Sequence, residues 1–344
     1  MARKALIIGG TGTISTGVTQ NLKDHPEWEV YLLNRGTHTE EVPETIHILK
    51  GDIRNEEETA KLLDGMSFDV VADFIGFTPE QVAADIRLFR GKTKQYIYIS
   101  SVSVYQKPLS NAVVTESTPL YNQYWQYSRD KIACEELLME EYRKTGFPIT
   151  IVRPSSTYGD KSPLVGICGS KGCWQVLERM RRGKPVIVHG DGTSLWTYTH
   201  NSDFAKGFVG LMGNPRAIGE SVHITSDEVL TWNQIHEIVA EALGVKANLI
   251  HMSTDFITAC APERKEAMMG DIAHSVIVDN SKIKKLVPEF CATVRYDQGA
   301  RKGVEYMLSH PETQIPDPEF DQWCDDMIAA YEAGIQAFQK QKNG

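Results

Sequence analysis

Tyr127 and Lys131 have the residue types and the spacing for acid–base chemistry. They are four residues apart where residues 128–145 predict a helix, so their side chains share one helical face. A phenol titrates near a pH of about 10, and a nearby cation favours the phenolate that takes a proton from a hydroxyl group. Ser101, after a predicted strand at 96–99, could orient the same substrate oxygen. We therefore predict Ser101, Tyr127 and Lys131 as catalytic residues, although this spacing also occurs in ordinary amphipathic helices.

A glycine-rich turn, residues 9–15 (GGTGTIS), separates a predicted strand at 5–8 from a predicted helix at 13–23. Gly9 and Gly12 permit a tight turn and a close approach of the backbone to a pyrophosphate at the helix N-terminus. Ser15 occupies the third glycine position and is small enough for close packing. Because the turn follows the first predicted strand, we expect a dinucleotide site here rather than a plain strand–helix turn.

The end of the second predicted strand, residues 30–33, bears on the choice of dinucleotide. Asn34 and Arg35 follow it, and neither is the carboxylate that accepts hydrogen bonds from the ribose hydroxyls of NAD. Arg35 could pair with a 2′-phosphate, so NADP is favoured over NAD; the alternative is a surface arginine stacked on adenine. The predicted cofactor contacts are Gly9, Thr11, Gly12, Thr13, Ile14, Asn34, Arg35, Asp52, Ile53, Asp73, Phe74, Ile75, Ser100, Tyr127, Lys131 and Pro154.

The elements that must position these residues alternate along the first half of the chain. Apolar runs predict strands at 5–8, 30–33, 46–49, 68–73, 96–99 and 149–152, and amphipathic patterns predict helices at 13–23, 56–64, 79–90 and 128–145. Strands that are apolar on both faces and separated by helices indicate a parallel sheet covered on both sides. We predict an α/β fold, a Rossmann-type doubly wound parallel sheet with a smaller C-terminal α/β substrate-binding cap.

The two predicted domains interleave along the chain. Residues 1–160 form the NAD(P)-binding domain, to which residues 186–222 return, and residues 161–185 and 223–344 form the cap. Helices are expected at 173–182, 202–212 and 231–243, and the segment 297–340 looks mostly helical.

Composition limits the classes of partner. Of 344 residues 41% are hydrophobic, and 36 basic against 45 acidic residues leave a net charge of −9, which disfavours nucleic acid. We expect no membrane partner, since no apolar run reaches the roughly 18 residues of a membrane span, and we expect a cytoplasmic location. Six cysteines without a CxxC pair or a histidine cluster predict reduced thiols and no metal.

Taken together, these motifs resemble those of extended short-chain dehydrogenase/reductases of the NAD-dependent epimerase/dehydratase type. The resemblance rests on Gly9-x-x-Gly12, Gly51-Asp52, Ser100-Ser101-x-x-Val104-Tyr105, Glu116-x-x-Pro119, Tyr127-x-x-x-Lys131, Arg153-Pro154, Tyr158-Gly159, Gly190-Asp191-Gly192-Thr193, His200, Asp203 and Asp279-Asn280-Ser281-Lys282. It implies hydride transfer assisted by Ser101, Tyr127 and Lys131. It also implies homodimers formed through a pair of helices.

Two departures from that family concern the substrate. The family's nucleotide-sugar enzymes hold the diphosphate with two arginines, and the corresponding positions here are Trp196 and Met268. We therefore expect a sugar-like substrate without a nucleotide diphosphate, unless a cation elsewhere replaces the arginines: Arg179, Arg181, Arg264 or Lys265. Val102 and Ser103 stand where dehydratases of the family carry an Asp-Glu pair, which argues against a dehydratase.

The predicted function is that of an NAD(P)-dependent oxidoreductase or epimerase acting on a secondary hydroxyl or ketone of a sugar-like small molecule. Tyr124, Trp125 and Trp196 could offer stacking surface to that substrate. The alternative is a non-catalytic NAD(P)-sensing or RNA-binding protein on the same scaffold. Residues 9–12 (GGTG) and 69–73 (DVVAD) also resemble the chloroplast stem-loop RNA-binding branch of the superfamily.

Overall fold

The computed structural model describes residues 2–342, which form two compact units. Unit 1 contains the chain up to residue 157 together with residues 197–227 and 278–293. Unit 2 contains residues 158–196, 228–277 and the chain from 294 on. Strand β9 (Val186–His189) pairs with β14 (Leu249–Met252) inside unit 2. Of the segment 186–222 that we predicted to return to the first domain, residues 197–222 lie in unit 1 and residues 186–196 lie in unit 2.

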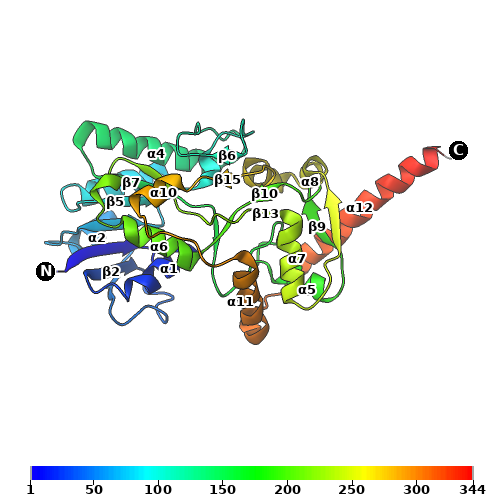
Figure 1. Cartoon of the computed structure of the whole chain (residues 1–344), viewed down its shortest axis with the longest axis horizontal. Helices are drawn as coiled ribbons and strands as arrows, with labels where there is room; N and C mark the ends of the chain where they lie inside the picture. Colours follow the sequence, from blue (N-terminus) through cyan, green and yellow to red (C-terminus); the bar gives the residue numbers. More distant parts are fainter. Residues whose placement is uncertain (1, 343–344) are drawn as a thin grey trace. The chain divides into compact units, whose positions relative to one another are not determined.

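Unit 1 is built on a seven-stranded parallel sheet with the strand order β12-β7-β5-β4-β1-β2-β3 (Figure 1). Its strands are β1 (Arg3–Ile8), β2 (Trp28–Asn34), β3 (His47–Lys50), β4 (Val70–Asp73), β5 (Tyr96–Ile99), β7 (Ile149–Arg153) and β12 (Ser221–His223). The chain winds outward from β1 in one direction and from β4 in the other. The carboxyl ends of β1 and β4 therefore lie side by side at the switch point, where dinucleotides bind in such folds.

Helices cover both faces of this sheet, as a doubly wound fold requires. One face packs α1 (Thr13–Leu22), α6 (Asn201–Leu211) and α10 (Ser281–Leu286); the other packs α2 (Glu56–Leu62), α3 (Pro79–Phe89) and α4 (Gln126–Thr145). Alternate residues of β1 enter the two cores: Ala5 and Ile7 one, Leu6 and Ile8 the other. The predicted fold class is thus confirmed, and burial on both faces explains the unbroken apolar strands.

Short elements complete unit 1. They are the single-turn helix η1 (Val102–Val104), the short helix η2 (Pro215–Ala217), and strands β6 (Val113–Val114) and β11 (Tyr198–His200). β6 pairs with β15 (Ile277–Val278) and β11 with β8 (Ser156–Tyr158).

Unit 2 is mainly helical. Its longer helices are α5 (Trp174–Arg181), α7 (Trp232–Ala242), α11 (Tyr296–Ser309) and α12 (Pro318–Lys342), with α8 (Thr254–Cys260) and α9 (Lys265–Ala267) between them and η3 (Pro262–Arg264), η4 (Met268–Ile272) and η5 (Pro311–Thr313) as short turns. Besides β9 and β14, strands β10 (Leu195–Trp196) and β13 (Leu230–Thr231) pair. Figure 1 shows the last part of α12, in red, extending away from the other elements of unit 2.

Candidate active site

The side chain of Ser15 stabilises the glycine-rich turn through hydrogen bonds, whereas the sequence indicated only that this residue is small enough for close packing. Ser15 Oγ donates a hydrogen bond to the carbonyl oxygen of Gly9 (2.6 Å) and accepts one from the backbone N–H of Gly12 (3.0 Å). Gly9 has a φ of +79°, and a Cβ there would lie 2.4 Å from Cγ2 of Ile75. A Cβ on Gly12, by contrast, would meet only Ser15 Oγ, at 3.5 Å. The side of the turn at Gly12 is therefore open, at the start of α1 where a phosphate binds.

Donors and cations gather where β2 ends. Asn34 Oδ1 accepts a hydrogen bond from the backbone N–H of Gly36 (2.9 Å), while the buried Nδ2 of the same amide has no hydrogen-bond partner among residues 2–342. The exposed Arg35 is next in sequence, and the aliphatic part of Lys50 lies against Gly36. An amide donor and two cationic side chains thus belong to residues at or next to the paired ends of β2 and β3.

The other predicted cofactor residues lie at the same carboxyl edge. Asp52 is exposed and its Oδ1 accepts from the backbone N–H of Arg54 (3.0 Å), whereas Ile53 is buried. Pro154 is buried directly after β7, and its carbonyl accepts from Val102 N (3.0 Å).

Asp73, at the end of β4, is fully buried and shapes the loop that follows. Its Oδ1 accepts from the backbone N–H groups of Ile75 and Gly76 (both 2.9 Å), and its Oδ2 accepts from the Tyr96 hydroxyl (2.9 Å). Burial, and then the charge of Asp73, raise the pKa of the neighbouring Asp85 to about 9. Asp85 is therefore protonated at neutral pH. Sequence analysis missed both Asp85 and Tyr96 as supports of this loop.

Lys131 lies on α4 with its side chain inside the protein. Its Nζ donates to the carbonyl oxygens of Gly76 (2.8 Å) and Ile99 (2.7 Å), and only 2% of the residue is exposed. Burial lowers the pKa of Lys131 to about 8. The ammonium lies 4.7 Å from the ring centroid of Tyr98 and 5.8 Å from that of Tyr127. The structure thus brings the predicted pair together on the first turns of α4.

Tyr127 is the second residue of α4, which begins at Gln126 rather than near residue 128 as predicted. A buried asparagine explains this start. Asn122 Oδ1 accepts from the backbone N–H groups of Tyr124 and Trp125 (both 3.2 Å), and its Nδ2 donates to the carbonyl of Ser103 (2.8 Å). The ring of Trp125 lies 4.8 Å from that of Tyr127. Asn122 was not predicted as a site residue, because a lone asparagine in a loop carries no signal of its own.

The serines after β5 have three different environments. Ser101 Oγ accepts from the backbone N–H of Ser103 (3.1 Å) and donates to no residue among those described. Ser128 Oγ donates a hydrogen bond to Ser103 Oγ (2.9 Å), which connects this turn to the residue after Tyr127. Ser100 Oγ is buried and has no hydrogen-bond partner within residues 2–342. Ser100 and Ser101 therefore both have a hydroxyl hydrogen without an acceptor among residues 2–342, and of the two Ser101 is the more exposed.

The predicted substrate-stacking residues fall in different units. Tyr124 and Trp125 are half-buried in unit 1. Trp196 is buried in unit 2, where its ring lies 5.3 Å from that of Trp232. Met268 is also buried in unit 2.

These residues fit a dinucleotide. The open turn at Gly12 adjoins the switch point, and two buried polar atoms, Asn34 Nδ2 and Ser100 Oγ, lie at the carboxyl ends of β2 and β5 without a hydrogen-bond partner among residues 2–342. Buried polar atoms in proteins are normally hydrogen-bonded, so such atoms at a binding edge indicate a ligand. Within residues 2–342, no three or more His, Cys, Asp or Glu side chains are grouped to hold a metal ion. None of the described helices has the length and hydropathy needed to cross a membrane.

A doubly wound sheet with a Tyr-x-x-x-Lys helix beside its switch point defines an extended short-chain dehydrogenase/reductase. The model of the family described as "NAD dependent epimerase/dehydratase family" matches residues 5–90 and 85–225. The chain belongs to this family.

Two curated relatives and one solved structure illustrate its range. The chain is 26% identical over 290 residues to 2′-dehydrokanamycin reductase of Streptomyces kanamyceticus, covering 83% of this chain and 80% of that protein. It is 26% identical over 259 residues to the chloroplast stem-loop binding protein of 41 kDa b of Arabidopsis thaliana, covering 70% of this chain and 64% of that protein. The structure of UDP-glucuronic acid 4-epimerase from Bacillus cereus, in complex with UDP-glucuronic acid and NAD, has a TM-score of 0.71 at 20% identity and covers 89% of this chain and 99% of that one.

Proposed function

We propose that this protein is an NADP-dependent reductase of a ketone on a sugar-like substrate, with Ser101, Tyr127 and Lys131 as its catalytic residues. The observation that carries the proposal is the position of the Lys131 ammonium. It is buried, it donates hydrogen bonds to two backbone carbonyl oxygens, and it lies near the ring of Tyr127, one helical turn earlier.

Each residue has a distinct role in the proposed reaction. The Tyr127 hydroxyl gives a proton to the ketone oxygen, or takes it back in the reverse direction. Lys131 favours the phenolate because its charge is fixed nearby. Ser101 donates a hydrogen bond to the same oxygen and orients the carbonyl. A bound nicotinamide supplies the hydride.

The preference for NADP is supported by the groups after β2. Arg35, Lys50 and the unpartnered amide donor of Asn34 suit a 2′-phosphate, which is dianionic and accepts several hydrogen bonds. The ribose hydroxyls of NAD would find no carboxylate at the end of β2 to accept their hydrogen bonds.

A substrate without a nucleotide diphosphate is supported by unit 2. The two family arginine positions hold the buried Trp196 and Met268. Among the possible replacements, Arg179 pairs with Asp321 (2.5 Å) and Asp325 (2.7 Å). Arg181 pairs with Glu178 (3.1 Å). These two cations are already occupied, and each missing charge-assisted contact would cost about 1.5–3 kcal/mol of diphosphate binding.

The reductase reaction is supported by the relative from Streptomyces kanamyceticus, whose printed name specifies a dehydrokanamycin. That name denotes an aminoglycoside ketone, a sugar substrate that has no nucleotide. We propose the same chemical class, a ketone on a glycoside without a nucleotide, for this protein.

The test is NADPH oxidation with ketones of aminoglycosides and with UDP-keto sugars, using the wild type, Tyr127→Phe and the control Tyr124→Phe. We expect turnover of a ketone without a nucleotide, and a loss on the order of a hundredfold or more in Tyr127→Phe alone. Full activity in Tyr127→Phe would refute the mechanism. A preference for the UDP-sugar would refute only the substrate, and cofactor binding without turnover of any ketone would favour the non-catalytic alternative.

A further inference from the structure

Phe77 is an aromatic residue in the loop after β4, and 45% of it is exposed. Its backbone N–H donates a hydrogen bond to Gln81 Oε1 (2.8 Å) on α3. The residue before it is Gly76, whose carbonyl accepts a hydrogen bond from Lys131 Nζ (2.8 Å). The position of Phe77 is therefore fixed by α3 on one side and by the lysine of the site on the other.

Three aromatic rings lie close to the Lys131 ammonium. Its nitrogen is 4.7 Å from the ring centroid of Tyr98, 4.8 Å from that of Phe77 and 5.8 Å from that of Tyr127, all within the range of cation–π attraction. Tyr98 is fully buried and Tyr127 is half-buried, so Phe77 is the most exposed of the three. Only 2% of Lys131 is exposed. The ring of Phe77 therefore lies on the outer side of this enclosure, where it separates the ammonium from water.

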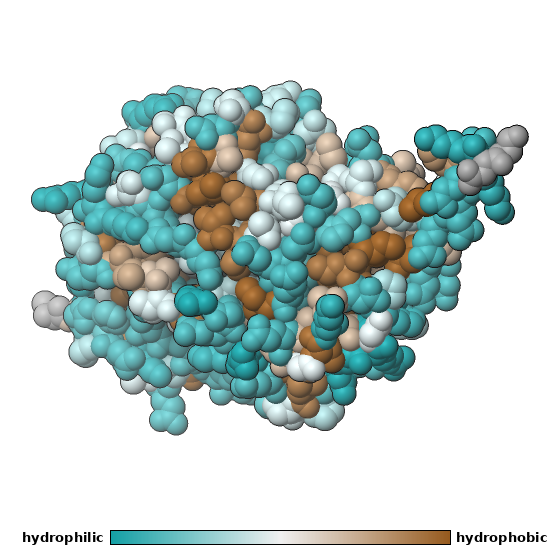
Figure 2. Space-filling model, turned by 45° about the vertical axis from the view of Figure 1, so that its right-hand side comes forward, coloured by the Kyte–Doolittle hydropathy of each residue, from teal (hydrophilic) through white to brown (hydrophobic). Residues whose placement is uncertain are grey.

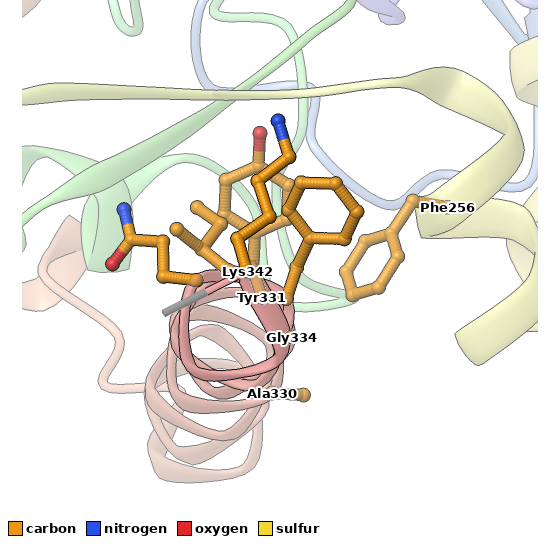
Figure 3. Close-up of a pocket in the computed structure, with 8 residues that line it drawn as sticks. Phe256, Ala330, Tyr331, Gly334 and Lys342 are labelled. Carbon is orange, nitrogen blue, oxygen red and sulfur yellow. The ribbon is translucent and has the colours of Figure 1, made fainter. Parts of the chain in front are cut away.

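Burial of the lysine distinguishes this contact from a similar one on the surface. Hydrophobic side chains reach the surface in several places (Figure 2). One of them, Phe338 on α12, also has a lysine over its ring, since Lys342 Nζ lies 5.4 Å from the centroid. Figure 3 shows Lys342 among the residues that line a hollow beside α12, and this lysine is exposed. Phe338 and Lys342 thus form the same kind of contact without the enclosure.

Burial is the largest influence on the charge of Lys131, and it lowers the pKa of this lysine to about 8. The titratable groups around the ammonium are Arg54 after β3, Asp73 at the end of β4, Tyr98 on β5, and Tyr127, Cys134 and Glu135 on α4. Asp73, Cys134 and Glu135 raise the pKa of the lysine, whereas Arg54 lowers it. Because burial has a greater effect than any of these groups, the access of water decides at which pH the lysine loses its charge.

We propose that Phe77 is a positioning residue for the reaction of Tyr127 and Lys131, because its ring keeps water away from the ammonium. The inference rests on the proposed function, in which the lysine cation stabilises the phenolate that remains when Tyr127 donates its proton. Water favours the charged form of an amine, so a lysine open to water would stay charged at a higher pH. The ring thus sets the upper end of the pH range in which the pair works.

Two substitutions separate the cover from the aromatic face. Phe77→Leu keeps an apolar side chain over the ammonium but removes the ring, so the pKa of Lys131 should stay at its wild-type value or fall. Phe77→Ala removes both, and the affinity of Lys131 for its proton should increase about tenfold or more, which moves its pKa towards the ordinary value of 10.5. Phe338→Ala is the matched control, because it removes a ring beside a lysine that is already exposed.

The titration of Lys131 can be followed in the full chain without any substrate. NMR spectra of protein with isotope-labelled lysine, recorded from a pH of about 6 to about 11, give the midpoint, and Lys131→Arg identifies the resonance. Melting curves show whether each variant is folded. A midpoint in folded Phe77→Ala that equals the wild-type midpoint would overturn the proposal. A rise in Phe77→Leu as large as that in Phe77→Ala would overturn it as well.

The pH dependence of ketone reduction tests the link to the reaction. Above a pH of about 8 the wild type should lose kcat/KM, because a neutral amine no longer stabilises the phenolate. In Phe77→Ala this decline should move to higher pH by the same interval as the NMR midpoint, while Phe338→Ala should behave as the wild type. A decline that stays in place while the midpoint moves would overturn the role in the reaction. If the wild type reduces no ketone, the proposed function fails, whereas the NMR midpoints still decide whether Phe77 covers the lysine.

Discussion

The Lys131 ammonium nitrogen lies 2.8 Å from the carbonyl oxygen of Gly76, whose backbone N–H in turn lies 2.9 Å from Asp73 Oδ1. Gly76 therefore links a buried carboxylate at the end of β4 to the buried lysine on α4. A Cβ on Gly76 would lie 2.2 Å from Asp73 Oδ2, so only glycine leaves room for this close approach. The loop after β4 thus fixes the lysine that the proposed chemistry requires.

Asp85→Asn should stabilise the protein, and the gain should increase with pH. The pKa of Asp85 is raised by burial to about 9, so the folded state retains a proton that the unfolded state releases above its usual value of 3.8. The contribution of Asp85 to the free energy of unfolding therefore falls as pH rises from about 4 to 9, by up to about 1.4 kcal/mol per pH unit, and asparagine removes this loss. Urea unfolding at pH 5 and pH 8 measures the effect. An equal shift at both pH values would contradict the assignment.

Gly12→Ala should weaken NADP binding at least tenfold without loss of stability. Its φ of −81° suits alanine, and the added Cβ meets only Ser15 Oγ at 3.5 Å, but it projects from the turn where the pyrophosphate should lie. Gly10→Ala is the contrasting variant, since its Cβ would lie 2.1 Å from Leu32 Cδ1 and so strain the fold. Titration by fluorescence, with melting curves alongside, separates the two effects. Unchanged affinity in a folded Gly12→Ala protein would remove the turn from the cofactor site.

The secondary structure could be predicted from the sequence wherever burial produces a simple pattern. The predicted strand at 96–99 matches β5, and the predicted helix at 79–90 matches α3 within one residue, because runs of apolar residues and helical periodicity directly reflect the packed faces. The pairing of Tyr127 with Lys131 could also be predicted, since spacing within one helix fixes it.

The support of the site could not be predicted, because it depends on contacts between distant segments. Asp85 looks like any polar residue of an amphipathic helix, yet packing of α3 on the sheet buries it beside Asp73 and Tyr96. Helix α4 begins two residues before the predicted start at residue 128. The hydrogen bond from Asn122 to the carbonyl of Ser103, 19 residues earlier, positions this start, and no local pattern indicates such a contact.

Arg35→Ala should reduce the affinity for NADPH about tenfold or more while NADH affinity changes little. The exposed guanidinium is expected to pair with the 2′-phosphate, which NADH lacks. Lys50→Ala should show the same selectivity with a smaller loss, since the lysine is a single mobile charge. Isothermal titration with both cofactors gives the ratio. Equal losses for NADPH and NADH would place Arg35 on the adenine instead.

Two buried histidines of unit 2 resist protonation, so their contribution to the free energy of unfolding should fall as pH drops from about 6.5 to 4. His189 Nε2 lies 2.9 Å from the Ile272 carbonyl and His236 Nδ1 lies 2.7 Å from the Trp232 carbonyl, so each ring keeps a proton on that nitrogen. Their other ring nitrogens are buried without partners among residues 2–342, and burial lowers the pKa of each histidine to about 4.

In the unfolded chain each of these two histidines becomes a cation below a pH of about 6.5, whereas in the folded protein each stays neutral above a pH of about 4. Their contribution to the free energy of unfolding is therefore fully present above a pH of about 6.5. Between these limits each histidine contributes a slope of up to about 1.4 kcal/mol per pH unit. The slope of the free energy of unfolding against pH gives the number of protons that the chain takes up when it unfolds. His236→Phe should lower this number by about one, while His38→Asn, at an exposed position, should leave it unchanged. Fluorescence of Trp232, whose ring lies 4.8 Å from that of His189, should report the transition. A pH dependence that is identical in wild type and His236→Phe would show that this imidazole is protonated in the folded protein as readily as in the unfolded chain.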